Sequence, residues 1–340
     1  MNRLFFIFLS LLVFQARSLE ATFSIVYESK ASKDALHALL LEIPKKVVSK
    51  IPQRFHEHLK KYDFQIMVSA HCPRDGFFQE PKISGNKISG LCLKPDLLGT
   101  SRALEILAHE LFHAFHFIIY PDEPTWMREG LAQWFSFRVT GYFPAGTLQN
   151  GMARSTTSLR DDYDYEKNTA KDKEKYAHHF LYFYYLWNQC GGDELIWKII
   201  GGNAERIKGA QGIGQVLQIF WKKNQAKEQC FHIKESALFF EIARFHNRTL
   251  DENSPNKFRF QLKHLLSAHT KKVLSQVNEE ILKTLPSYQP IFLSSNQSLN
   301  NLKDDSFSVA WMKQSHPFNV IFSLEAPAQT SDWVGLFMKM

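Results

Sequence analysis

His109-Glu110-Leu111-Phe112-His113 is the stretch of this 340-residue chain that most constrains its fold and its chemistry. Two histidines four residues apart project from one face of an α-helix, about 40° apart around its axis. Both imidazole rings can therefore reach one metal ion. Glu110 follows the first histidine, where its carboxylate can act as a base toward a water molecule. Because five residues form a short motif, the surrounding sequence has to support it.

The residues around the motif have the pattern of a long helix. Leu104, Leu107 and Leu111 recur at helical spacing. Ser101 is a suitable N-cap, and the helix must end before Pro121 because proline disfavours helical backbone in the residue that precedes it. The motif is therefore predicted to lie within a helix, as its chemistry requires.

A second helix is predicted over residues 124–135, after an acidic turn that ends in Pro124. It carries Glu129, which lies 16 residues after His113, far enough for the chain to turn and return along the first helix. A catalytic zinc ion has three protein ligands and keeps a fourth position for water, so Glu129 is the candidate third ligand. Gly130 beside it would let two helix backbones approach closely.

These two segments together resemble the gluzincin zinc metallopeptidases. The HELFH stretch and the Pro-Thr-Trp-Met-Arg-Glu-Gly-Leu-Ala pattern are most similar to the peptidase MA-like branch over residues 109–135, with a looser likeness to about residue 200. The resemblance implies that His109, His113 and Glu129 bind one zinc ion. It also implies that Glu110 is the general base of a peptide-bond hydrolysis.

Two positions depart from the family pattern. Gln133 stands where thermolysin-like enzymes have an aspartate that orients a ligand histidine, and Arg128 stands where many relatives have asparagine. These departures concern the groups around the ligands and leave the ligand set intact. His116 shares the face of the two histidines but lies about 4.5 Å further along the axis than His113, so packing is favoured over metal binding.

The resemblance also implies a tyrosine or histidine that stabilises the oxyanion. In peptidase MA-like relatives a tyrosine begins the helix that follows the glutamate ligand. An aromatic-rich helix is predicted over residues 175–187. Tyr176 is therefore the first candidate, and His178 and His179 are the alternatives.

The predicted fold class is α+β. We expect a gluzincin-like unit over residues 19–250, with a small mixed sheet in 19–100 and a mainly helical, thermolysin-like part in 101–250. In the family an edge strand of the sheet holds extended substrate; residues 86–93 are the candidate, with an ordinary core strand as the alternative. Residues 251–340 are expected to form a small α/β or β-rich accessory unit.

Residues 1–18 have the features of a secretory signal peptide. Arg3 precedes an apolar stretch over residues 4–14, and Ala16-Arg17-Ser18 fits a cleavage site. The apolar stretch is too short to span a bilayer, although an uncleaved anchor stays open. The mature protein is therefore expected to be secreted or periplasmic, without stable membrane insertion.

Export would permit disulfides, and the chain has four cysteines. Of the three pairings, Cys72–Cys92 with Cys190–Cys230 is favoured because each pair lies within one region of the sequence.

The net charge is only mildly basic, +7, and no run of Lys or Arg stands out, so no nucleic-acid partner is predicted. The favoured function is an exported zinc peptidase that acts on peptides or proteins. The alternative is a catalytically inactive binding protein of the cell envelope with a peptidase fold, for which Arg128 and Gln133 are the support.

Overall fold

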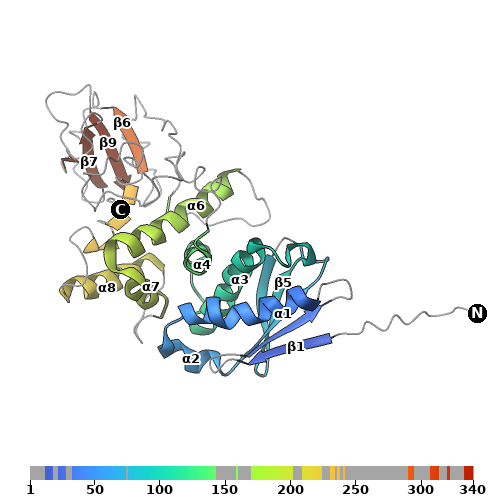
Figure 1. The fold of residues 1–340 in the computed structure, drawn as a ribbon. Coiled ribbons are helices and arrows are strands. Elements are labelled where there is room, and N and C mark those ends of the chain that lie inside the picture. The colour runs from blue at the N-terminus through green and yellow to red at the C-terminus, as the bar shows by residue number, and fades with distance from the viewer. Residues whose placement is uncertain are drawn as a thin grey trace, which may run out of the picture. The chain divides into compact units, whose positions relative to one another are not determined.

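The fold is given by a computed structural model (Figure 1). It describes residues 12–17, 22–27, 33–73, 76–142, 158–159, 170–201, 209–223, 230–233, 236–237, 240–241, 290–294, 307–313, 320–321 and 333–339. The chain divides into two units: the first comprises Met1–Asp122 and Ala132–Tyr142, and the second comprises Glu123–Leu131 and Phe143–Met340.

A five-stranded mixed sheet is the main β-structure of the first unit (Figure 1). In chain order its strands are β1 (Leu12–Arg17), β2 (Thr22–Tyr27), β3 (Asp63–Val68), β4 (Gly76–Ser84) and β5 (Lys87–Leu93). The order across the sheet is β1-β2-β3-β5-β4, with β2, β3 and β5 parallel and the two outer strands antiparallel to their neighbours. The predicted small mixed sheet is therefore present.

Alternation of apolar residues explains the central strand β3. Phe64 and Ile66 are fully buried, whereas Met67, the residue after Ile66, is 50% exposed. A period of two places the buried residues on one face of the sheet. Phe64 lies in register with Phe23 of β2 and packs edge-on against Phe115, with ring centroids 5.0 Å apart. Phe115 belongs to helix α3 (Ser101–Ile119), so these rings join the sheet to that helix.

The strand predicted to be the substrate-holding edge lies inside the sheet. β5 pairs with β3 on one side and with β4 on the other, so that expectation was wrong and the alternative of a core strand holds. The outer strand beside β5 is β4, which was not predicted from the sequence. The available signal was the two-residue Gly85-Asn86 turn, with Gly85 at φ +63°, because such turns join antiparallel strands. Helix α3 packs against both β4 and β5.

Short helices precede the central strand in the first unit. They are α1 (Lys33–Glu42), the π-helical turn η1 (Ile43–Val47), the 3-10 turn η2 (Val48–Lys50) and α2 (Gln53–Leu59). Pro44 and Pro52 interrupt this helical stretch. Helix α1 contacts β1 and β2, and its Leu36 and Leu40 side chains are buried.

The second unit contains an aromatic-rich helix and a separate antiparallel sheet. Its elements after residue 143 are α6 (Ala170–Tyr185), the π-helical turn η4 (Leu186–Gly191), α7 (Gly192–Gly201), α8 (Gly209–Lys222), β6 (Pro290–Ser294), β7 (Phe307–Lys313), β8 (Val320–Ile321) and β9 (Trp333–Lys339). The sheet order is β6-β9-β7-β8. The predicted boundary at residue 250 and most of the predicted signal peptide lie outside the described residues.

Both predicted disulfides are present. Cys72 bonds to Cys92, which ties the segment after β3 to β5, and Cys190 bonds to Cys230. No cysteine is left free. None of the described helices combines the length and the apolar composition that a bilayer crossing requires.

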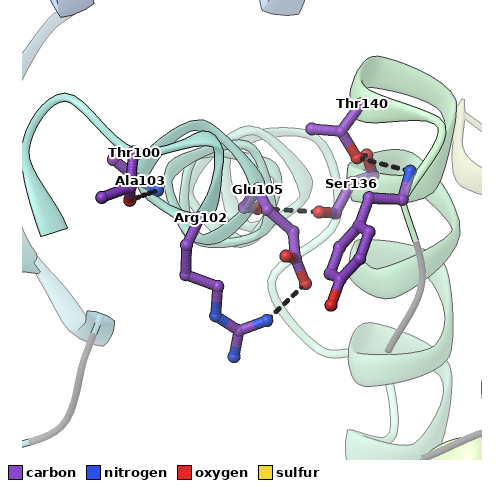
Figure 2. Close-up of polar contacts among 7 residues, drawn as sticks. Thr100, Arg102, Ala103, Glu105, Ser136 and Thr140 are labelled. Carbon is purple, nitrogen blue, oxygen red and sulfur yellow. Dashed lines mark hydrogen bonds and ion pairs between the residues drawn. The ribbon is translucent and has the colours of Figure 1, made fainter. Parts of the chain in front are cut away.

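The N-cap of α3 is Thr100, and the prediction of Ser101 was wrong by one residue. The side chain of Thr100 accepts a hydrogen bond of 3.3 Å from the backbone N–H of Ala103 (Figure 2). We expect Thr100→Ala to lower the free energy of unfolding by about 1 kcal/mol, because it removes the side-chain acceptor of this N–H and leaves only the backbone carbonyl of Thr100, 3.2 Å away. The neighbouring Ser101→Ala is the control and should change stability by less than roughly 0.5 kcal/mol. Chemical denaturation of both variants makes the comparison, and equal losses would contradict the capping role.

Candidate metal centre

Helix α3 brings two predicted ligands together. His109 and His113 lie one turn apart, are both half-buried, and have their Nε2 atoms 3.0 Å apart. Their rings are almost perpendicular, at 85°, with centroids 4.6 Å apart. Because the two Nε2 atoms face a common volume, one metal ion can bind to both. Glu110, also half-buried, follows His109 on the same helix.

Glu129 completes a group of three. It lies on helix α4 (Thr125–Thr140) and is only 3% exposed. One carboxylate oxygen of Glu129 and one ring nitrogen from each of His109 and His113 lie within 4.8 Å of one another. Within the described part of the chain, this is the group of His, Cys, Asp and Glu side chains that could hold a metal. His116 does not belong to it: that side chain is 1% exposed, and its ring lies 5.5 Å from the ring of Phe112.

The donor set fits a zinc ion. Two imidazole nitrogens and one carboxylate are the ligand set of several catalytic zinc sites. Zinc–ligand bonds of about 2.0–2.1 Å in a tetrahedral arrangement separate two ligand atoms by roughly 3.3 Å. The observed 3.0 Å between the Nε2 atoms of His109 and His113 is close to that separation.

A buried hydrogen bond links α3 to the C-terminal half of α4 in the first unit. The hydroxyl of Ser136 donates to the backbone carbonyl of Glu105 over 2.7 Å, and Ser136 has no exposed surface (Figure 2). Ser136 lies two helical turns after Glu129 and Glu105 lies one turn before His109. The bond therefore fixes the register of the helix that carries Glu129. Ser136 was not predicted from the sequence, although its spacing of seven residues from Glu129 places both on one helical face.

The side chain of Glu105 adds a carboxylate one turn before His109. Its Oε1 accepts a hydrogen bond of 2.7 Å from Arg102 (Figure 2). Burial raises the pKa of the Glu105 carboxyl, while Arg102 and, to a lesser degree, His109 act in the opposite direction. Carboxylates near a ligand histidine tune its orientation and basicity, and Gln133, which is buried on α4, cannot supply that charge.

Gly130 allows the close approach of another helix backbone, as predicted. A methyl group at this position would lie 2.7 Å from Cδ2 of Phe183 and 3.0 Å from the carbonyl carbon of His179. Both residues are on α6, so α6 is the helix that packs against the N-terminal half of α4. The absence of a side chain at Gly130 thus permits the packing beside Glu129.

The three candidates for stabilising the oxyanion differ in burial. His178 and His179 have no exposed surface, whereas Tyr176 is half-buried. Nε2 of His178 lies 2.7 Å from Oε1 of Glu241, so this ring is engaged in the interior. Burial holds the pKa of His179 well below its ordinary value, with His178 acting in the same direction and Glu129 opposing it. The role of Tyr176 stays a prediction.

Comparisons with known proteins give a distant structural likeness. No protein-family model matches the chain, and no curated protein sequence matches it. A yeast LTA4 hydrolase structure in complex with bestatin is 16% identical over 62% of this chain, with a TM-score of 0.43. Native yeast LTA4 hydrolase is 14% identical over 70% (TM-score 0.41), and an aminopeptidase N family protein from Idiomarina loihiensis is 15% identical over 86% (TM-score 0.38).

This chain spans 37%, 44% and 51% of the lengths of those three proteins. At these identities and TM-scores the likeness assigns neither a family nor an activity to the chain.

Gly130→Ala should destabilise the protein. The added methyl group would overlap the Phe183 ring and the α6 backbone, and overpacking of this kind costs about 1–3 kcal/mol. Gly214→Ala in helix α8 is the matched control, because the nearest atom there is 3.5 Å away, an ordinary contact. That control should be neutral or stabilising by up to about 1 kcal/mol. Thermal and urea unfolding measure both variants; a neutral Gly130→Ala would mean that α6 does not approach α4 so closely.

Proposed function

We propose that the protein is an exported, zinc-dependent peptidase of the gluzincin type. The observation that carries the proposal is the convergence of His109, His113 and Glu129, with Glu110 on the same helix as the two histidines. A carboxylate beside a His-His-Glu ligand set is an arrangement that zinc peptidases use to activate water for hydrolysis of a peptide bond.

A zinc ion bound to these three residues would polarise the scissile carbonyl and lower the pKa of a water molecule at its open position. Glu110 takes a proton from the attacking water and delivers it to the leaving amine. Tyr176 donates a hydrogen bond to the oxygen of the attacked carbonyl as negative charge develops there. The reaction needs no covalent link between the enzyme and the acyl group.

The proposed substrate is a peptide or protein in extended conformation. Strand β4 is the outer strand of the sheet in the first unit, and α3, which carries Glu110, packs against it. Backbone groups on the outer side of such a strand can bond to a peptide of any sequence. We assign substrate alignment to β4 in place of β5, which has strands on both sides.

Two observations are compatible with export. All four cysteines are paired in disulfides, which persist in oxidising compartments. The predicted signal peptide would direct the chain there.

A binding protein with an inactive peptidase fold is the second candidate. Arg128, which stands in place of the asparagine of many relatives, donates a hydrogen bond of 3.3 Å to Oγ1 of Thr125. Gln133 is buried and has no carboxylate to replace the aspartate of thermolysin-like enzymes. This candidate predicts that the protein's function does not change when the carboxylate of Glu110 is replaced.

Glu110→Gln distinguishes the two functions. It keeps the size of the side chain and removes the base, so cleavage of a mixed peptide library should fall by at least about 100-fold, while the zinc content stays near that of the wild type. Mass spectrometry of the library and metal analysis of the purified protein give the two measurements. Glu129→Ala is the companion variant and should lose both zinc and cleavage.

Removal of zinc by a chelator should also abolish cleavage, and added zinc should restore it. Equal cleavage by the wild type and by Glu110→Gln would exclude the proposed mechanism. A wild type that binds zinc and peptide but cleaves nothing would favour the binding protein.

A further inference from the structure

A short segment of the second unit is bonded to helix α6 and to the turn that follows it, by one disulfide and two hydrogen bonds. We call the described residues 230–233, 236–237 and 240–241 the strap. Its first residue, Cys230, forms the disulfide with Cys190, which lies in the turn after α6. The other two links join the strap to α6 itself: the hydroxyls of Ser236 and Tyr182 lie 2.9 Å apart, and Oε1 of Glu241 lies 2.7 Å from Nε2 of His178.

The two hydrogen bonds are directional and one helical turn apart. His178 and Tyr182 are separated by four residues on α6, so they share a face of that helix. All four bonded side chains are completely buried. Two bonds at different heights along one face restrict both rotation and sliding of α6 against the strap.

A buried pair such as His178–Glu241 has a larger effect on position than on stability. Removing one partner of a buried pair is strongly destabilising, yet replacing both by apolar side chains of similar volume is often neutral or stabilising. Apolar contacts would therefore supply equal stability here. What they would not supply is a bond of fixed length and direction between α6 and the strap.

The neighbouring face of α6 contacts the part of α4 that carries Glu129. His179 and Phe183 follow the bonded residues by one position each, about 100° further around the helix. They touch Gly130, and the Phe183 ring stacks on Trp126 with centroids 5.8 Å apart and planes at 18°. Since Gly130 has no side chain to adjust, any displacement of α6 reaches the α4 backbone directly.

We propose that His178 and Glu241 are a positioning pair for the Glu129 ligand. Their bond fixes α6 against the strap, and α6 in turn fixes the α4 backbone at Gly130, so that the Glu129 carboxylate is held in place for the metal. All of these residues belong to the second unit. The inference rests on the metal site of the proposed function. It adds a positioning role for two residues that are distant from Glu110 in the sequence, His178 by more than sixty positions and Glu241 by more than one hundred.

The decisive variant replaces the pair by apolar side chains of similar size, His178→Leu with Glu241→Met. It leaves no uncompensated charge, so the protein should fold with a melting temperature close to that of the wild type. The Kd for Zn²⁺, measured by competition with a chromophoric chelator, should rise about tenfold, the lower end of the effect of losing a group that orients a ligand. The visible absorption spectrum of the Co²⁺-loaded protein should change as well, because it reports the geometry of the ligands.

Two further variants supply the rescue and the control. Glu241→Gln keeps an acceptor for the N–H of His178 and should keep the wild-type Kd and Co²⁺ spectrum. Glu194→Ala removes an exposed carboxylate of the same unit, 3.7 Å from Lys198, and should change neither.

A folded double variant with unchanged Zn²⁺ affinity and Co²⁺ spectrum would show that the pair is structural only and would overturn the proposal. If the double variant does not fold, the same two measurements are made on Glu241→Ala well below its melting temperature. Unchanged Zn²⁺ affinity and Co²⁺ spectrum in that variant would overturn the proposal as well. A wild type that binds zinc but cleaves no peptide contradicts the proposed function alone, because this test reads metal binding. A wild type that binds no zinc contradicts both.

Discussion

The burial of the Glu129 carboxylate is the constraint on which the candidate site depends. A charged group that is only 3% exposed is costly unless a hydrogen bond or an opposite charge compensates it. A metal ion shared with His109 and His113 would supply that charge where the three side chains converge. The position of α4 therefore matters more than that of any surface loop, because it decides whether the carboxylate reaches the two histidines.

Helix α4 is held by different means along its length. Its C-terminal half belongs to the first unit, where Ser136 donates to the backbone of α3 over 2.7 Å. Its N-terminal half belongs to the second unit, where Gly130 and Trp126 pack against α6. A hydrogen bond restrains the C-terminal half of α4 along its axis, and close packing restrains the distance of its N-terminal half from α6. Each restraint is specific to its own unit, and an unbroken helix connects them.

Local patterns in the sequence predicted the parts of the site that lie on single helices. The spacing of His109 and His113, the helix around them and the helix that carries Glu129 follow from a period of 3.6 residues, which is a property of neighbouring positions. The disulfides were predictable because each joins cysteines of one region. The outer strand β4 was missed because its signal was only a two-residue turn.

Contacts between distant residues could not be predicted in this way. Glu241 and His178 are 63 positions apart, and no periodicity connects them. The same is true of Ser136 and Glu105, which are 31 apart. Such contacts depend on how whole helices pack. A single sequence indicates helix packing only at positions where no larger side chain fits, such as Gly130.

Removal of the predicted signal peptide would change the border of the sheet in the first unit, because strand β1 would be removed with it. Strand β1 consists of Leu12–Arg17, which lies within the predicted signal peptide, and it pairs antiparallel with β2. Cleavage after Ser18 would remove it, and the backbone groups of Thr22–Tyr27 that now bond to β1 would face water. An open strand edge readily accepts another strand. Among the described strands, the sheet would then end at β2 and at β4, whereas in the full chain β1 covers β2.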